Sequence, residues 1–222
     1  MEKELTGRSH GIIMYQMVGT EREGFMREKG IRTRARVLSG AKEIFHRHGF
    51  SGTSINDLIR ETGVKKGNLY HYFSSKEEMG LEVLSLARED FFKFLEKSLR
   101  GERPSAQLAN HFEAIVRYHE GRNLVGGCIF GNTALEMSDR NDKYRAVIHA
   151  VFEEWRRRIR EVLERAVRSG DVRKDLDPEA GARHVVATIE GGIMLARASR
   201  NSADLKECLA TLSGFLGIRG GG

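Results

Sequence analysis

The chain has few of the residues that cross-link or interrupt a fold: its 222 residues include two cysteines and two prolines. Cys128 and Cys208 have no CxxC or Cys/His metal spacing around them, which excludes a disulfide framework and suggests a reducing compartment. The longest early apolar run, Ile12–Val18, has seven residues and contains Gln16. This run is too short to span a membrane, and nothing around it resembles a signal peptide. We therefore expect a cytoplasmic protein without a membrane partner.

Two further patterns are missing, the Val, Ile and Thr alternation of strands and the signature motifs of enzymes. Apolar residues recur instead at helical steps, so we expect an all-α chain. No HExxH, glycine-rich phosphate loop or G-x-S-x-G is present. His46 and His48 point to different faces of a predicted helix, and the other histidines downstream stand singly. We predict a chain that is not an enzyme, with no catalytic residue, no metal site and no cofactor.

The net charge of +6 is concentrated in one segment. Residues 31–76 contain nine Lys and Arg against three acidic residues, whereas the other 176 residues balance 28 basic with 28 acidic side chains. A charge excess confined to one small unit is typical of a site for a polyanion, either nucleic acid or an anionic membrane. On charge alone, a solvated basic helix face is the plain alternative.

The same segment has the pattern of a helix-turn-helix. Apolar residues from Thr33 onward recur every three or four positions until Gly49, which predicts a first helix. A capping box of Ser54 and Asp57 opens a short second helix that ends at Gly63. A third helix is expected over residues 65–73, and a second capping box, Ser75 with Glu78, opens a fourth helix to about Leu99. Two short helices joined by a glycine turn and flanked by supporting helices form this motif.

The third helix carries side chains suited to reading DNA. If Val64, Leu69 and Phe73 face inward, the polar residues of the helix lie on its outer face, where it fits the major groove. Lys donates to guanine and Asn pairs with adenine, whereas Tyr hydroxyls and a Lys at a helix start suit phosphates. For one of the two tyrosines, core packing is the favoured alternative. The predicted DNA-binding residues are Ser54, Lys65, Lys66, Asn68, Tyr70, His71, Tyr72 and Lys76.

The stretch TSINDLIRETGVKKGNLYHYFSSKEEM, residues 53–79, resembles the DNA-binding segment of the tetracycline-repressor (TetR) family of bacterial regulators. The specific marks are Thr53-Ser54, Gly63-Val64, Lys66-Gly67, LYHYF at 69–73 and SKEEM at 75–79. The similarity extends back through ARVLSGAKEIFHRHGFSGTS and covers about 50 residues closely. Lys65 departs from the pattern, because many members carry a helix-capping Ser or Thr at that position. A lysine weakens the cap and adds charge toward DNA.

The resemblance implies three parts along the chain. Residues 1–30 lack sustained periodicity and are expected to be a poorly ordered N-terminal extension. Residues 31–76 would form the three-helix DNA-binding domain, and residues 77–222 a larger helical ligand-binding and dimerisation domain. Helices are expected over residues 107–119, 132–137, 142–170, 178–199 and 204–216, with Gly126, Gly127 and Gly131 interrupting the helical pattern.

The resemblance also places an effector pocket and a dimer seam in this second part. The pocket is expected among Phe112, Val116, Phe130, Met137, Phe152 and Trp155, for each of which ordinary core packing is an equal alternative. Polar groups of the ligand would be bound by Tyr118, Asn132 or Glu136. No cationic cluster is evident there, which favours a mainly hydrophobic, neutral or cationic ligand. The dimer interface is expected at Ile189, Gly191, Gly192 and Ile193, with close packing inside one chain as the alternative.

Together these patterns predict a homodimeric, ligand-responsive transcriptional regulator, most simply a repressor. It would bind a palindromic double-stranded DNA operator through the helix-turn-helix and be released by a small-molecule effector. The alternative is an architectural DNA-binding protein without an effector. An internal apolar cavity in the second part would distinguish the two, because dimerisation alone does not require one.

Overall fold

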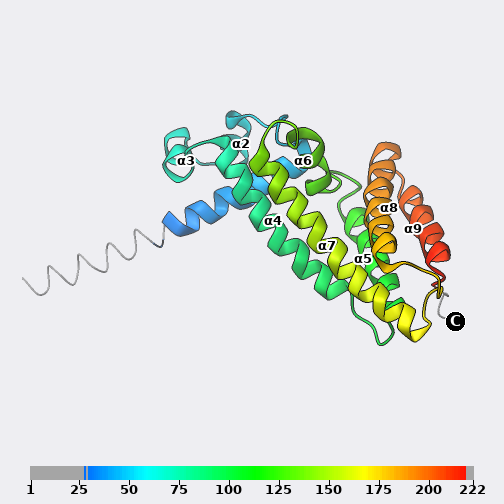
Figure 1. The fold of residues 1–222 in the computed structure, drawn as a ribbon. Helices are drawn as coiled ribbons and strands as arrows, with labels where there is room; N and C mark the ends of the chain where they lie inside the picture. Colours follow the sequence, from blue (N-terminus) through cyan, green and yellow to red (C-terminus); the bar gives the residue numbers. More distant parts are fainter. Residues whose placement is uncertain (1–27, 29, 219–222) are drawn as a thin grey trace, which may run out of the picture.

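The computed structural model describes residue 28 and residues 30–218, which are helices joined by turns with no strand among them. The predicted extension over residues 1–30 lies almost wholly outside the described residues. The first helix is described over residues 30–48. The others are α2 (Ile55–Thr62), α3 (Lys66–Tyr72), α4 (Lys76–Ser98), α5 (Pro104–Gly121), α6 (Ile129–Met137), α7 (Asp142–Ser169), α8 (Pro178–Ser199) and α9 (Ala203–Leu216). Figure 1 shows the short helices at one end, α8 and α9 at the other, and the long α4 and α7 between them.

The helix ends follow from local sequence. Both prolines open helices, Pro104 in α5 and Pro178 in α8, where the missing N–H would have no helical partner. Gly63, Gly170 and Gly217 close α2, α7 and α9 with φ between +65° and +74°, a left-handed conformation that glycine adopts without steric cost. The prediction of an all-α fold is therefore confirmed over the described chain.

Two predicted features of these helix ends need correction. Ser75 accepts a hydrogen bond from the Glu78 amide (3.0 Å), but the Glu78 carboxylate bonds the amide of Ser74 (2.6 Å) instead of that of Ser75, so the second capping box is only half formed. Gly131 does not interrupt a helix, because it lies inside α6, which begins at Ile129 rather than at residue 132. A side chain at Gly131 would collide with Glu190 of α8.

The core has two clusters of buried residues. One joins the first helix, α2, α3 and the start of α4 to α6 and the first half of α7, and the other fills the space among α4, α5, α7, α8 and α9. At the junction, the Tyr144 hydroxyl of α7 donates to the Glu77 carbonyl (2.9 Å). Gly80 leaves room for this contact, since a Cβ there would meet the Tyr144 hydroxyl and the Phe50 ring. The short N-terminal helices are thus packed directly on α6 and α7.

Candidate nucleic-acid interface and internal cavity

α2 and α3 form the helix-turn-helix with the predicted cap and turn. The Ser54 hydroxyl accepts from the Asp57 amide (3.2 Å) and the Asp57 carboxylate accepts from the Ser54 amide (2.9 Å). Hydrogen bonds from Ser54 and then Arg60 lower the pKa of Asp57 to about 2, so the cap stays ionised at all ordinary pH values. Gly63 supplies the turn with φ +65°.

The outward face of α3 is basic and unpaired. Val64, Leu69 and Phe73 are buried, as predicted, and this fixes the rotation of the helix. Lys65, Lys66, Asn68 and His71 are exposed, and neither lysine forms an ion pair with a described residue. Lys65 stands at the N-cap without a side-chain hydrogen bond, as the departure from the family pattern implies. Two uncompensated cations and an amide therefore project from one short helix.

The other predicted DNA contacts differ in exposure. Tyr70 is 46% exposed, whereas Tyr72 is half-buried against the core of the short helices. Lys76 is half-buried too, with its Nζ 4.3 Å from the centre of the Phe50 ring, and burial lowers its pKa. The N-terminus of α4 disfavours a cation, and the face of an aromatic ring offsets part of that cost. A phosphate contact by Lys76 remains a proposal.

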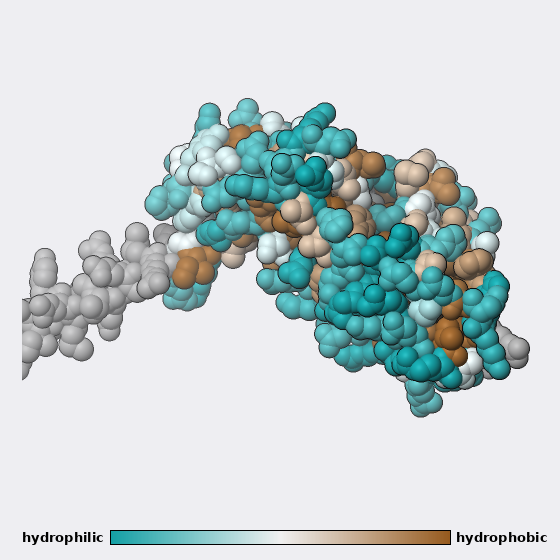
Figure 2. Space-filling view, in the orientation of Figure 1, coloured by the Kyte–Doolittle hydropathy of each residue, from teal (hydrophilic) through white to brown (hydrophobic). Residues whose placement is uncertain are grey.

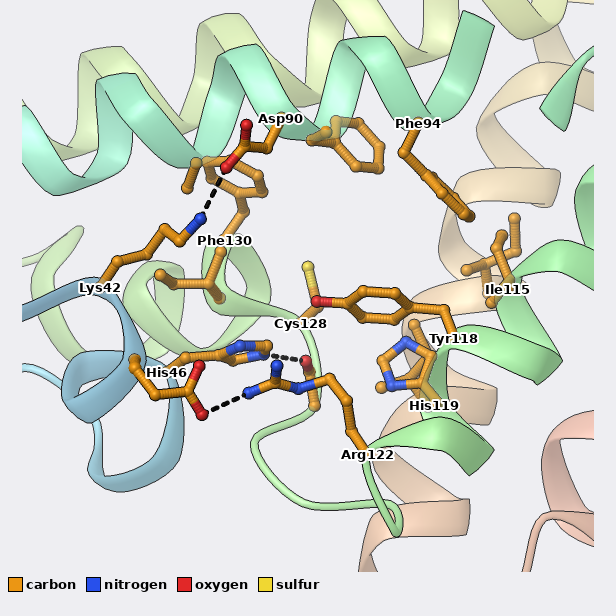
Figure 3. Close-up of a pocket in the computed structure, with 17 residues that line it drawn as sticks. Lys42, His46, Asp90, Phe94, Ile115, Tyr118, His119, Arg122, Cys128 and Phe130 are labelled. Carbon is orange, nitrogen blue, oxygen red and sulfur yellow. Dashed lines mark hydrogen bonds and ion pairs between the residues drawn. The ribbon is translucent and has the colours of Figure 1, made fainter. Parts of the chain in front are cut away.

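A cavity of about 230 Å³ lies between the first helix and α4, α5, α6 and α8. Aromatic and aliphatic side chains form most of its wall, among them Phe91 and Phe94 of α4, Ile115 of α5 and Phe130 of α6. Figure 3 shows polar side chains at two sides of this space, Lys42 and Asp90 at one side and His46, His119 and Arg122 at the other. The cavity thus has an apolar middle and polar ends.

Ionic and hydrogen bonds across the cavity tie the first helix to the C-terminal helices (Figure 3). Lys42 pairs with Asp90 of α4 (2.6 Å), and Glu43 pairs with Arg122 at the end of α5 (2.9 Å). His46 Nε2 donates to the Gly127 carbonyl (2.6 Å). The groups that tie the first helix to the other helices are therefore part of the cavity wall.

Two imidazoles in this wall have lowered pKa values. Burial, and to a lesser extent the charge of Arg122, lowers the pKa of His46. Burial, His46 and Arg122 together lower the pKa of His119 to about 4. The His119 side chain is 6% exposed and forms no hydrogen bond with a described residue, although it lines the cavity.

The six predicted pocket residues do not lie together around this cavity. Among the six predicted pocket residues only Phe130 lines it. Phe112 and Val116 face α9 in an open groove on the other side of α5, and Met137 is buried in the N-terminal cluster. Phe152 and Trp155 are one turn apart on α7 and pack behind the wall, the Trp155 ring edge-on to Phe91 (4.9 Å between centroids).

Sequence reasoning missed the contribution of α4 and of the first helix. The first helix is predicted as part of the DNA-binding domain and α4 as the start of the second domain, but Phe91, Phe94, Lys42 and Glu43 are not among the predicted pocket residues. The run DFFKF at residues 90–94 was the available signal. No cationic cluster is expected around the six predicted residues, whereas Lys42 and Arg122 line this cavity. Of the three proposed polar groups, only Tyr118 lines it.

The predicted dimer residues divide between two faces of α8. Ile189 and Ile193 face inward and line the cavity, and a Cβ on Gly192 would lie 2.8 Å from Leu205 of the same chain. These three residues pack within one chain, and their place in a dimer interface stays a prediction. Gly191 faces open space, beside Met194 and Leu195, which are 60% and 50% exposed. Figure 2 shows apolar patches among hydrophilic surface at the α8–α9 end.

Among the described residues, no helix is long and apolar enough to cross a membrane, and no group of three or more His, Cys, Asp or Glu is arranged to hold a metal ion.

Comparison with known proteins matches both parts of the chain to family models. Residues 37–83 match the model described as bacterial regulatory proteins, tetR family, and residues 104–212 match the tetracyclin repressor-like C-terminal domain. The chain is 28% identical over 185 residues to the HTH-type transcriptional repressor DhaR of Mycobacterium sp. (strain GP1), covering 81% of this chain and 89% of that protein.

Solved structures give the same result. A TetR transcriptional regulator from Chloroflexus aurantiacus J-10-FL is 33% identical with a TM-score of 0.78, covering 85% of this chain and 96% of that one. A regulatory protein TetR from Rhodobacter sphaeroides is 25% identical with a TM-score of 0.77, covering 81% and 96%. These relatives are regulators of transcription by name, and none of them is named as an enzyme.

Proposed function

The chain belongs to the tetR family of bacterial regulatory proteins, which are DNA-binding regulators of transcription, and we propose that it is a homodimeric repressor whose release from its operator is controlled by a small molecule bound in the internal cavity. The observation that carries this proposal is the composition of the cavity wall. The first helix of the DNA-binding unit supplies Lys42, Glu43 and His46, and the remaining wall comes from α4, α5, α6 and α8.

DNA recognition is assigned to the exposed face of α3. Each protomer places α3 in a major groove, where Lys65, Lys66 and Asn68 reach base edges and Ser54, Tyr70, His71, Tyr72 and Lys76 lie toward the backbone. The two half-sites of a palindromic operator would lie about one turn apart, ~34–36 Å. The charge of the segment supports this assignment, since its two α3 lysines have no ion-pair partner in the described chain.

Release follows from the position of the cavity. A ligand that fits only when the first helix has moved away from α5 stabilises that conformation by its difference in affinity for the two states. The Glu43–Arg122 pair and the His46–Gly127 hydrogen bond are the contacts that such a ligand would rearrange. A modest difference in affinity is enough, because coupling energies of about 1–3 kcal/mol change operator affinity 5- to 150-fold.

The dimer is assigned to the exposed faces of α8 and α9. Gly191, Met194 and Leu195 of α8 and Phe215 of α9 are accessible, and an antiparallel pairing of these helices with a second copy would cover them. The domain boundaries at residues 30/31 and 76/77 and a cytoplasmic location remain part of the proposal. An architectural DNA-binding protein without an effector is the alternative, and the largely apolar cavity disfavours it.

Operator titration tests the DNA assignment. An operator selected from a random duplex library by the wild-type protein would be titrated with wild type and with a Lys65/Lys66/Asn68 triple-alanine variant at fixed salt. Loss of Lys66 or Asn68 alone is expected to cost about 1–3 kcal/mol at the selected site. A Lys93→Ala/Lys97→Ala variant, which removes two exposed lysines from the other end of α4, is the matched control. Equal affinity of the triple variant and the wild type would exclude α3 as the reading helix.

A further inference from the structure

The cavity has one end that is more basic than the rest. At the end formed by Lys42 and Asp90, a direct ion pair cancels the two charges. At the opposite end, Arg122 and Arg47 both donate to one oxygen of Glu43, each at 2.9 Å, and Glu61 lies 4.0 Å from Arg47. Arg197 lies behind Gly127, donating to the neutral amide of Asn132 (3.0 Å), with no carboxylate of the described chain within ion-pair distance. The second end therefore carries a net positive charge.

The pKa values of the two histidines are consistent with this charge. Burial is the main cause of the lowered pKa of His46 and His119, and Arg122 lowers both further. A site where a nearby cation opposes protonation of an imidazole is a site that attracts an anion. His46 already donates to Gly127, whereas His119 has no partner in the described chain and remains available to a ligand.

The guanidinium of Arg122 also has unused donors. Its Nη2 donates to Glu43, and its Nε is buried without a hydrogen-bond partner. The Tyr118 hydroxyl lies in the same wall (Figure 3) and forms no hydrogen bond with a described residue. Three groups of α5, namely Tyr118, His119 and Arg122, thus present polar atoms to one end of an apolar space. Such convergence of a few polar groups is typical of the part of a pocket that orients a ligand.

From this arrangement we propose that the effector is a small monocarboxylic acid with an apolar or aromatic body. Its carboxylate lies at the Arg122 end of the cavity, where His119 and Tyr118 donate to it, and its body lies against Phe91, Phe94 and Phe130. The inference rests on the proposed function, because it assigns a ligand class to the same cavity. The ligand is small: about 230 Å³ is below the roughly 300–1,000 Å³ of most drug-sized pockets and corresponds to the liquid volume of roughly eight waters.

The test compares acids with their neutral isosteres. Benzoate, phenylacetate and hexanoate and their primary amides would be titrated into the protein, with Trp155 emission and thermal shift as readouts. Trp155 is the only tryptophan and contacts the cavity-lining Phe91. Since a hydrogen bond to a charged group is stronger than a neutral one, at least one acid is expected to bind roughly ten- to a hundredfold more tightly than its amide.

Three variants separate charge from structure. Arg122→Gln should abolish the preference for the acid. Glu43→Gln breaks the same ion pair but keeps the cation, so it should retain or increase that preference. Arg117→Gln, an exposed arginine on the same helix that pairs with Glu113, should behave as wild type. If Arg122→Gln retains the full preference for the acid, or if Glu43→Gln loses it, the assignment of the carboxylate to Arg122 is wrong.

Measuring operator release distinguishes an error in the ligand class from an error in the proposed function of the cavity. Equal binding of acids and amides, or no binding of any of the three acids, overturns the ligand class. If an amide alone binds and releases the operator, the proposed function stands and the acid assignment fails. If acids bind through Arg122 without releasing the operator, the ligand site is supported and control of DNA binding by the cavity is refuted.

Discussion

Replacing Glu190 by glutamine should stabilise the protein, and only at neutral and alkaline pH. The Glu190 carboxyl of α8 lies against Gly131 and Cys128 of the α6 region, and its Oε1 is buried with no hydrogen-bond partner. Burial raises its pKa from 4.5 to about 7, and the hydrogen bond with Cys128 offsets only part of that effect. The folded protein therefore holds the proton of Glu190 more tightly than the unfolded chain does.

The size and sign of the effect follow from linkage. Because the pKa is higher in the folded state, stability falls as pH rises from 4.5 to about 7, and the penalty is complete above that range. A shift of this size corresponds to about 3 kcal/mol, at about 1.4 kcal/mol per unit. Glutamine cannot ionise, so Glu190→Gln removes the penalty where it exists. Stability should increase by up to about 3 kcal/mol at pH 8 and change much less at pH 5.

The assay is urea unfolding of wild type and variant at pH 5 and pH 8, at one protein concentration because a dimer's stability depends on it. Glu207→Gln is the control, since Glu207 of α9 is exposed and its loss should shift stability little at either pH. A Glu190→Gln variant that is equally or less stable than wild type at pH 8, with an unchanged pH profile, would refute the reasoning. It would mean that the carboxylate has a partner in the folded protein.

Three other predictions concern packing, assembly and DNA. Gly80→Ala should destabilise the protein by about 1–3 kcal/mol because its Cβ would meet the Phe50 ring at 2.7 Å. Gly121→Ala is the control and should not lower the melting temperature, since a Cβ there has nothing within 4 Å. Equal melting temperatures for the two variants would contradict the packing around Gly80. Gly191→Leu should be monomeric by sedimentation and lose operator binding. A variant that remains dimeric would show that the dimer interface is not on this face of α8. Lys76→Ala should weaken specific and non-specific DNA binding alike and flatten the dependence of DNA affinity on salt concentration. An unchanged salt dependence would show that Lys76 contacts no phosphate.

The sequence predicts the helix-turn-helix well because its determinants are local. The Ser54 cap, the turn at Gly63 and the inward positions of Leu69 and Phe73 depend on residues within a few positions of one another. The long helices were also predictable, since α8 begins at a proline and α7 ends at a glycine.

The cavity could not be predicted in the same way because its wall is assembled from distant segments. Glu43 meets Arg122 across 79 positions of the chain, and His46 meets Gly127 across 81, and no periodicity shows which helices will face each other. Apolar residues such as Phe112 and Trp155 have the same helical spacing whether they line a cavity or fill a core. The face of α8 was uncertain for a related reason: both Gly191 and Gly192 permit close approach, and only the position of Leu205 shows which one is used inside the chain.

The most direct test of control by the cavity is the distance between the two α3 helices of a dimer with and without a cavity ligand. Spin labels would be placed at Gly67→Cys, a position on α3 with nothing within 4 Å. Cys128 and Cys208 would be replaced by alanine, and ligand binding by this chain would first be matched to wild type because Cys128 lines the cavity. Without ligand, the distance distribution should fit half-sites about one helical turn apart, ~34–36 Å. A ligand that changes Trp155 emission and releases the operator should shift that distribution. Release with an unchanged distribution would contradict the account.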